Sequence, residues 1–215
     1  MTDVLYVAAK APVPGRVKTR LAQAIGDDAA TGLYRAFLLD LATRFPSASW
    51  YVTPLGEWKR SGIAPGRPCL EQPPGDWTER QRSLFRGAAE RGESRVVLIA
   101  SDSPQLPEKT VAEAFALLDA HELVLGPVAD GGYYLIGLRG WHDVLRGVAM
   151  STGSVLDELL RAAQSLGLSA ATLAQTYDVD ELADLELLAY DADTRDDLAA
   201  TRAALDGLRV GSLVT

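Results

Sequence analysis

Four cationic side chains close to the start of the chain could bind an anion. They are Lys10, Arg16, Lys18 and Arg20, and they lie in the segment KAPVPGRVKTR that follows a short apolar run. Arginine offers forked donors that fit phosphate oxygens, and lysine acts as a compact positive charge. Gly15 permits close approach of the backbone, whose N–H groups can also face an anion. The segment therefore predicts a polyphosphate-binding loop, with a solvated basic turn as the alternative.

Acidic residues that follow predicted strands could hold a divalent cation. Asp102 comes just after the apolar run RVVLIA, and Asp180 follows the last predicted strand in the sequence Tyr-Asp-Val-Asp. Magnesium takes one or two carboxylates together with substrate phosphates, so Asp102 and Asp180 are candidate ligands of Mg²⁺ or Mn²⁺. The alternative for each is to cap a turn or a helix. Asp193, in the similar sequence Tyr-Asp-Ala-Asp, is a further candidate for the second ligand.

The segment GPVADGGY at residues 126–133 could form one wall of a ligand site. Gly131 and Gly132 follow Asp130, and paired glycines let the backbone approach a ligand. Asp-Gly is also a strong signal for a β-hairpin. The two interpretations are compatible, because a hairpin can itself form the wall of a site.

Strands and helices that could position these residues alternate along the chain. Strands are expected at residues 4–9, 50–52, 95–100, 122–125, 133–138 and 170–173, and helices at about 27–45, 77–91, 107–120, from about 154 onward and at the end. Residues 54–76 are rich in proline and glycine and are expected to be irregular. The alternation predicts an α/β fold with a mainly parallel sheet, whose ligands bind at the carboxyl ends of the strands.

Composition and missing motifs exclude several classes of protein. The chain has 215 residues, of which 47% are hydrophobic, and a formal net charge of −8, so we expect no nucleic-acid partner. Cys69 is the one cysteine, which excludes an internal disulfide. No apolar run approaches the roughly 18 residues of a membrane span, and the first residues do not resemble a secretion signal. We expect a cytoplasmic protein that binds no membrane and exists as a monomer or homodimer.

The phosphate loop, the dinucleotide fingerprint and the serine-hydrolase elbow are all missing from the sequence.

Taken in order, these segments resemble GT-A-type nucleotide-diphospho-sugar transferases, and among them small bacterial glycosyltransferase-A-like proteins, some placed near arsenosugar biosynthesis. The resemblance covers nearly the whole chain and rests on KAPVPGRVKTRL, Gln72 to Arg80, Asp102 to Leu106, GPVADGGYY, Ser151-Thr152 and Asp178-Val-Asp180. Trp77-Thr78 departs from the usual Leu-Gly. Glu181 stands where a threonine is usual, whereas Thr194 follows Asp193, so either acid could be the second metal ligand.

The resemblance implies a single domain over residues 1–215 with a GT-A fold, in which helices flank a central sheet in three α/β/α layers. It implies catalytic roles for Lys18, Asp102 and Asp130 and metal binding by Asp102 and Asp180. The implied nucleotide- and phosphate-binding residues are Lys10, Gly15, Arg16, Lys18, Arg20, Gln72, Arg80, Gly131, Gly132, Tyr133, Ser151 and Thr152.

Two reactions fit this scaffold, because fold alone does not give function. In the first, a phosphorylated small molecule attacks the α-phosphate of a nucleoside triphosphate and releases pyrophosphate; the basic loop resembles that of phospholactate and molybdenum-cofactor guanylyltransferases. In the second, a glycosyl group leaves a nucleotide sugar, and Asp130 or another acid activates the acceptor hydroxyl. A non-catalytic nucleotide-binding protein is the third hypothesis.

Overall fold

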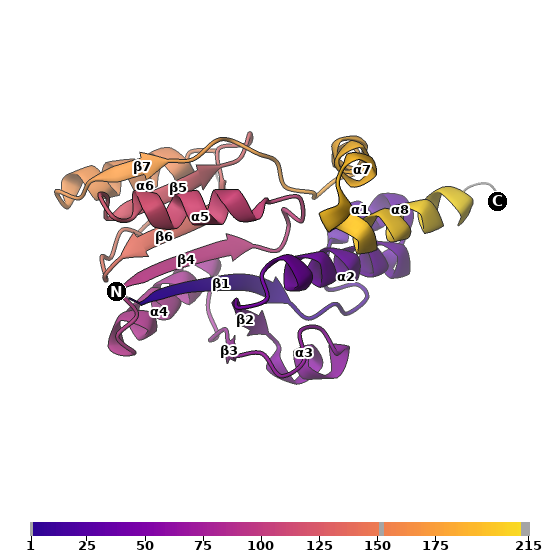
Figure 1. Cartoon of the computed structure of the whole chain (residues 1–215), viewed down its shortest axis with the longest axis horizontal. Helices are drawn as coiled ribbons and strands as arrows, with labels where there is room; N and C mark the ends of the chain where they lie inside the picture. Colours follow the sequence, from indigo (N-terminus) through magenta and orange to yellow (C-terminus); the bar gives the residue numbers. More distant parts are fainter. Residues whose placement is uncertain (1, 151–152, 212–215) are drawn as a thin grey trace. The chain divides into compact units, whose positions relative to one another are not determined.

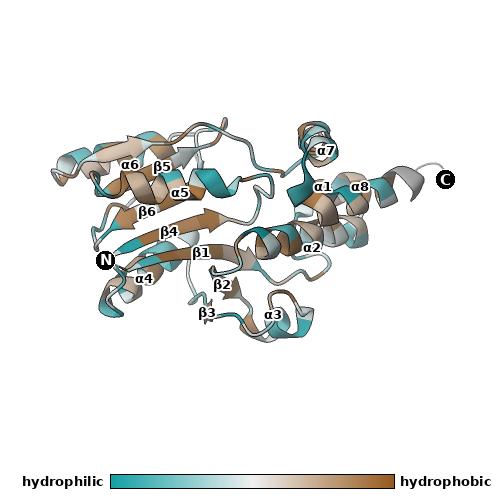
Figure 2. Ribbon diagram, in the orientation of Figure 1, coloured by the Kyte–Doolittle hydropathy of each residue, from teal (hydrophilic) through white to brown (hydrophobic). Residues whose placement is uncertain are grey.

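The apolar run at residues 95–100 forms a buried strand, as the sequence predicts. The computed structural model describes residues 2–150 and 153–211, and in it the four central residues of β4 (Arg95–Ala100) are buried. Figure 2 shows β4 in the brown of hydrophobic residues over most of its length. A strand that is buried on both faces requires covering layers on both sides of its sheet.

The described residues separate into two units that alternate along the chain. The first unit contains residues 2–8, 72–100 and 107–177, apart from 151–152, and the second contains residues 9–71, 101–106 and 178–211. Strand β1 (Asp3–Lys10) contributes residues to both units. That the two units act as one domain stays a prediction.

Five strands form the sheet of the first unit. Besides β1 and β4 they are β5 (Leu123–Pro127), β6 (Tyr133–Arg139) and β7 (Ala170–Thr172). Strands β1 and β4 pair in parallel, as do β5 and β7, whereas β6 runs antiparallel to both β4 and β5. Four of these five strands therefore point the same way, which confirms the mainly parallel sheet. The hairpin predicted around Asp130 is also confirmed, since residues 128–132 connect β5 to β6.

Helices cover both faces of this sheet. They are α4 (Trp77–Glu90), α5 (Glu108–Leu117) and α6 (Val155–Ser165). Helix α4 lies on the face that carries Leu98 and Ile136, with which it shares a small cavity. On the opposite face, a Cβ at Gly137 would come within 3.2 Å of Leu118, the residue directly after α5. The three α/β/α layers implied by the resemblance are therefore confirmed in this unit.

The second unit is built around α2 (Asp27–Arg44). Its other elements are α1 (Thr19–Ile25), β2 (Ser49–Thr53), α3 (Leu55–Ser61), β3 (Cys69–Glu71), α7 (Asp184–Thr194), a 3₁₀ turn (Asp196–Leu198) and α8 (Ala199–Gly211). Helix α2 packs against α1 and α8, and Figure 1 shows the yellow α8 alongside the purple α2. The Asp40 carboxylate on α2 accepts from the N–H groups of Ala200 and Thr201 and so fixes the start of α8. Among the described helices, none has the length and apolar character needed to cross a bilayer.

The expectation that residues 54–76 are irregular is wrong, because the segment contains α3 and β3. Helix α3 includes Gly56, which disfavours a helix, but it is held by Trp58, whose buried ring lies 4.8 Å from that of Trp50. Strand β3 has three residues and exists through its parallel pairing with β2. Helix α1 was also not expected from the sequence. Packing rather than local propensity determines these short elements.

Acid should weaken the attachment of β5 to β7 in the first unit. Glu122, just before β5, accepts hydrogen bonds from the Oγ and N–H of Ser169 and from Arg139. These bonds, led by that from the Ser169 hydroxyl, lower the pKa of Glu122 from 4.5 to about 2. Because the folded state prefers the charged form, the stabilisation is complete above about pH 4.5 and is lost as the pH falls toward 2. We expect Glu122→Gln to lower the free energy of unfolding by about 1 kcal/mol at neutral pH, and its denaturation curves to converge with those of the parent in acid. Equal stability at neutral pH would contradict this.

Candidate active site

The phosphate-binding loop predicted at residues 10–20 is shorter in the structure, because α1 begins at Thr19 and the loop ends at Lys18, which has a left-handed backbone conformation. Its φ and ψ are 47° and 44°, and it directly precedes α1. This conformation costs a residue with a side chain about 1–2 kcal/mol. Such strain persists where surrounding contacts determine the position, as they often do in functional sites. The backbone turns the Lys18 side chain into the second unit, where 3% of it is exposed.

The Lys18 ammonium group binds both predicted metal ligands. Its Nζ forms an ion pair with Asp102 Oδ1 and donates to Asp180 Oδ1 at 3.0 Å and to the carbonyl oxygen of Val179 at 2.6 Å. Burial by itself would lower the pKa of Lys18, but the two carboxylates more than offset this effect and raise the pKa above its ordinary value. Lys18 therefore stays charged at neutral pH.

We call Asp102 and Asp180 the acid pair. Their side chains are 43% and 41% exposed, so each presents oxygen to solvent as well as to Lys18. The N–H of Val179 donates to the carbonyl oxygen of Asp102 at 2.9 Å, which ties the two segments together. Two carboxylates that share one cation are close enough to bind a single metal ion. A pair of carboxylates completed by substrate phosphates suits Mg²⁺. No group of three or more potential metal-binding side chains occurs among residues 2–150 and 153–211.

Asp184, which the sequence analysis did not single out, positions the second acid. Its Oδ2 accepts from the N–H groups of Asp180 and Glu181 at 2.8 and 2.7 Å. The carboxylate of Asp180 binds Lys18 through Oδ1. Arg20 lies beside the same carboxylate, with 3.7 Å between its Nη1 and Asp180 Oδ2. Asp193, the other candidate, is an exposed residue near the end of α7.

Tyr34 on α2 contacts both the basic loop and the segment that carries Asp102. The sequence did not identify it as a site residue. Its hydroxyl accepts from the N–H of Lys10 at 3.1 Å and lies 2.8 Å from Ser101 Oγ, the residue before Asp102. Its ring centroid lies 5.9 Å from Lys18 Nζ, a favourable cation–π distance. Burial raises the pKa of Tyr34 well above 10, which keeps the hydroxyl protonated. In the sequence Tyr34 is one of several apolar residues at helical spacing, so nothing distinguished it from the core.

Removing the Tyr34 hydroxyl should therefore destabilise the second unit. Tyr34→Phe keeps the ring beneath Lys18 but leaves the Lys10 N–H and the Ser101 hydroxyl without this partner. We expect the free energy of unfolding to fall by about 1–3 kcal/mol, measured by chemical denaturation. Tyr51→Phe, at another buried tyrosine of this unit, is the comparison for a general effect of losing a phenol. An unchanged free energy of unfolding in Tyr34→Phe would contradict the prediction.

The remaining predicted phosphate ligands of the loop are exposed. Lys10 ends β1, Arg16 follows a turn closed by its N–H to the carbonyl of Val13, and Arg20 lies in α1. Gly15 has φ 72°, a conformation that disfavours any residue with a side chain. The structure thus brings Lys18, Arg20 and the acid pair together in the second unit, with Arg16 in the same loop.

The other predicted residues belong to the first unit. Asp130 accepts from the N–H of Gly132 at 2.9 Å. Gly131 has φ 88°, and a Cβ there would lie 2.1 Å from the carbonyl oxygen of Gly153, so packing alone requires glycine. Gln72 Oε1 accepts from Arg80 at 3.2 Å. Ser151 and Thr152 lie outside the described residues.

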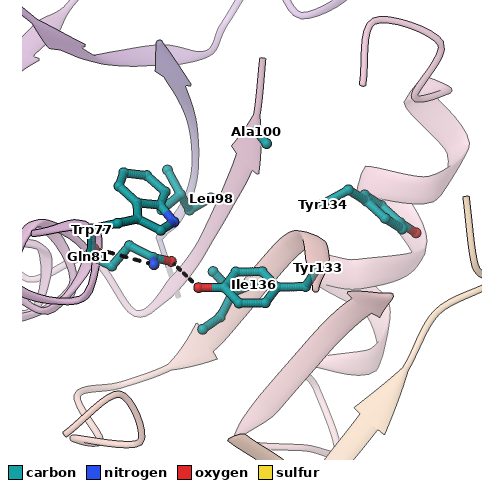
Figure 3. Close-up of a pocket in the computed structure, with 7 residues that line it drawn as sticks. All are labelled: Trp77, Gln81, Leu98, Ala100, Tyr133, Tyr134 and Ile136. Carbon is teal, nitrogen blue, oxygen red and sulfur yellow. Dashed lines mark hydrogen bonds between the residues drawn. The ribbon is translucent and has the colours of Figure 1, made fainter. Parts of the chain in front are cut away.

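Tyr133 lines a small cavity in the first unit rather than an open surface. Its hydroxyl donates to Gln81 Oε1 at 2.8 Å, and burial raises its pKa well above 10. Figure 3 shows this bond beside Trp77, with Leu98, Ala100, Tyr134 and Ile136 completing the lining. The cavity measures about 30 Å³. Gln81, a fully buried amide on α4, was not singled out from the sequence.

Comparisons with known proteins agree with this fold. A family described as "Uncharacterized protein conserved in bacteria (DUF2064)" matches residues 42–152. A protein from Desulfovibrio desulfuricans G20, provisionally described as a nucleotide-diphospho-sugar transferase, is 29% identical, with 97% of each chain covered and a TM-score of 0.88. No curated protein matches the chain.

More distant structures share the fold alone. A nucleotidyl transferase from Methanothermobacter thermautotrophicus has a TM-score of 0.57 at 15% identity, covering 90% of this chain and 99% of its own. The CMP:2-keto-3-deoxy-manno-octonic acid synthetase complexed with CTP has a TM-score of 0.54 at 13% identity, with coverage of 91% and 100%. These similarities confirm the nucleotide-diphospho-sugar transferase fold implied by the sequence resemblance.

Proposed function

The chain belongs to the bacterial family DUF2064, and we propose that it is a magnesium-dependent nucleotidyltransferase. The observation that carries this proposal is the half-exposed acid pair, held by buried Lys18 next to the basic loop. Carboxylates beside exposed arginine and lysine match the two components of a magnesium–triphosphate complex.

Asp102 and Asp180 would hold the metal ion, which when bound neutralises charge on the transferring phosphate. Lys10, Arg16 and Arg20 would bind the triphosphate, with Gly15 allowing the backbone to approach. A phosphate oxygen of the acceptor attacks the α-phosphorus, and the bond from the α-phosphorus to the oxygen bridging to the β-phosphorus breaks. The electron pair of that bond leaves with pyrophosphate. The residues act by positioning the reactants and neutralising charge.

The acceptor would be a small phosphorylated molecule, since a chain with net charge −8 is unsuited to nucleic acid. Gln72, Arg80, Gly131, Gly132, Tyr133, Ser151 and Thr152 stay predicted nucleotide-binding residues, and Asp130 a predicted catalytic one. Activity in the cytoplasm, as a monomer or homodimer, belongs to the same proposal.

Glycosyl transfer from a nucleotide sugar is the second candidate. It is supported by the provisional description of the Desulfovibrio protein, which is 29% identical and similar over nearly all of both chains. The three exposed cations of the basic loop favour the triphosphate, because a nucleotide sugar carries a diphosphate with less negative charge.

A binding panel followed by product analysis would separate the candidates. Nucleoside triphosphates and nucleotide sugars are tested with and without Mg²⁺ by thermal unfolding. A ligand at 100 times its dissociation constant stabilises by about 2.7 kcal/mol, or roughly 5–10 °C for a chain of this length. A magnesium-dependent shift with a triphosphate, followed by pyrophosphate release with phosphorylated acceptors, is expected. A shift confined to nucleotide sugars, with nucleoside diphosphate released, would replace the proposal by glycosyl transfer. Absence of any shift would favour a non-catalytic protein.

A further inference from the structure

The contacts of Lys18 point to a role other than the direct phosphate binding that its position in a basic loop predicts. The ammonium group donates to Asp180 Oδ1 and to the Val179 carbonyl oxygen, and it forms an ion pair with Asp102 Oδ1. With 3% of the side chain exposed, these three oxygen atoms leave little room for a phosphate at the nitrogen. Lys18 could bind a phosphate only after giving up one of the oxygen atoms that it now holds.

Lys18 occupies the position of a cation with respect to the acid pair. The two carboxylates carry a formal charge of −2, which one ammonium group reduces to −1. A divalent cation at the same carboxylates must either displace the ammonium group or bind a few ångströms from it. Both cost free energy, because like charges at such distances repel strongly in a partly buried site. Exposed cations outside the pair, such as Arg20, add to this repulsion.

We propose that Lys18 is a resident counter-cation that keeps free Mg²⁺ off Asp102 and Asp180, so that the metal enters together with the phosphates of the nucleotide. The phosphates make metal binding favourable, because their negative charge offsets the positive charges of Lys18 and Arg20. The proposal rests on the proposed function for the identity of the incoming anion. The role of Lys18 as counter-cation rests on the contacts of Lys18 alone.

Metal binding without catalysis tests the proposal. Mn²⁺ replaces Mg²⁺, and the free ion is followed by its electron paramagnetic resonance signal. Lys18→Met keeps the length of the side chain and removes its charge, so we expect at least about a tenfold tighter binding of Mn²⁺ alone than in the parent protein. Lys59→Met removes the same charge from an exposed lysine of α3 in the same unit and should leave Mn²⁺ binding unchanged. A Lys18→Met protein that folds and binds Mn²⁺ no more tightly than the parent would overturn the proposal.

A second measurement uses the parent protein and therefore does not depend on the variant folding. Calorimetric titration compares Mn²⁺ alone with Mn²⁺ and inorganic tripolyphosphate, which represents the phosphate chain of any nucleotide. We expect the complex to bind at least about tenfold more tightly than the free ion. Tripolyphosphate that binds the protein without tightening the binding of Mn²⁺ would overturn the proposal.

The two measurements also separate this inference from the proposed function. If tripolyphosphate does not bind but Lys18→Met gains Mn²⁺ affinity, the counter-cation role stands and nucleotidyl transfer fails. If the manganese complex binds the parent but Lys18→Met gains nothing, the counter-cation role fails and nucleotidyl transfer stands.

Discussion

Asp102→Asn is expected to lower kcat/KM for pyrophosphate release by at least about a hundredfold. The substitution keeps the size of the side chain but removes one of the two charges that would hold the metal. Loss of a single group that stabilises charge in a transition state commonly costs a factor of 10² to 10³. Asp102 also forms an ion pair with Lys18, so the variant leaves the buried ammonium group with one carboxylate. Steady-state pyrophosphate release at saturating Mg²⁺ measures the effect.

The same assay decides which later acid belongs to the site. Asp180→Asn should approach the loss in Asp102→Asn, because both carboxylates bind Lys18. Asp193→Asn removes an exposed acid near the end of α7 and should retain parental activity. Circular dichroism and thermal unfolding of each variant separate a loss of chemistry from a loss of fold. If Asp193→Asn is the inactive variant and Asp180→Asn is active, the assignment of the acid pair is wrong.

The sequence predicts those candidate site residues that follow the end of a strand. Asp102 follows a run that only a buried strand explains, so its place after the carboxyl end of β4 can be predicted. The glycines after Asp130 independently predict the hairpin between β5 and β6 in the first unit. Choosing Asp180 over Asp193 also depended on the strand before it. For such residues, the local sequence pattern predicts the position in the fold, and their roles in the reaction stay predictions.

What the sequence does not reveal are the partners that distant elements contribute. Tyr34 and Arg44 lie on α2 among residues typical of a buried helix face, and Asp184 resembles an ordinary acid in the first turn of α7. Their contacts with residues 101–106 and 178–181 exist only after folding. From its charge alone, Lys18 is predicted to bind phosphate. In the structure its side chain is buried and pairs with Asp102 and Asp180, and no local sequence pattern predicts this burial.

Arg44→Ala is expected to cause the largest loss of stability. The guanidinium group, 4% exposed, donates to the carbonyl oxygens of Pro104 and Leu106 and to both the carboxylate and the carbonyl oxygen of Asp197. Alanine would leave these acceptors buried without this donor, and it would leave a partly buried carboxylate without the Arg44 charge. Asp197 keeps its ion pair with Arg195, so the loss comes mainly from the buried carbonyl oxygens, each of which costs about 1–3 kcal/mol when left without a donor. Together these losses are a large part of the roughly 5–15 kcal/mol that holds a domain together.

Two other variants establish whether that loss comes from the directed hydrogen bonds. Arg44→Lys keeps the charge but lacks the fork that reaches several carbonyl groups, so an intermediate loss is expected. Arg35→Ala, on an exposed part of the same helix where the side chain donates to the Ser61 carbonyl, should change the free energy of unfolding by no more than about 0.5 kcal/mol. Urea denaturation measures all three. Arg44 binds the segment that directly follows Asp102. If Arg44→Ala loses no more stability than Arg35→Ala, other contacts fix this segment. Asp102 would then be positioned only through the contact of Tyr34 with Ser101.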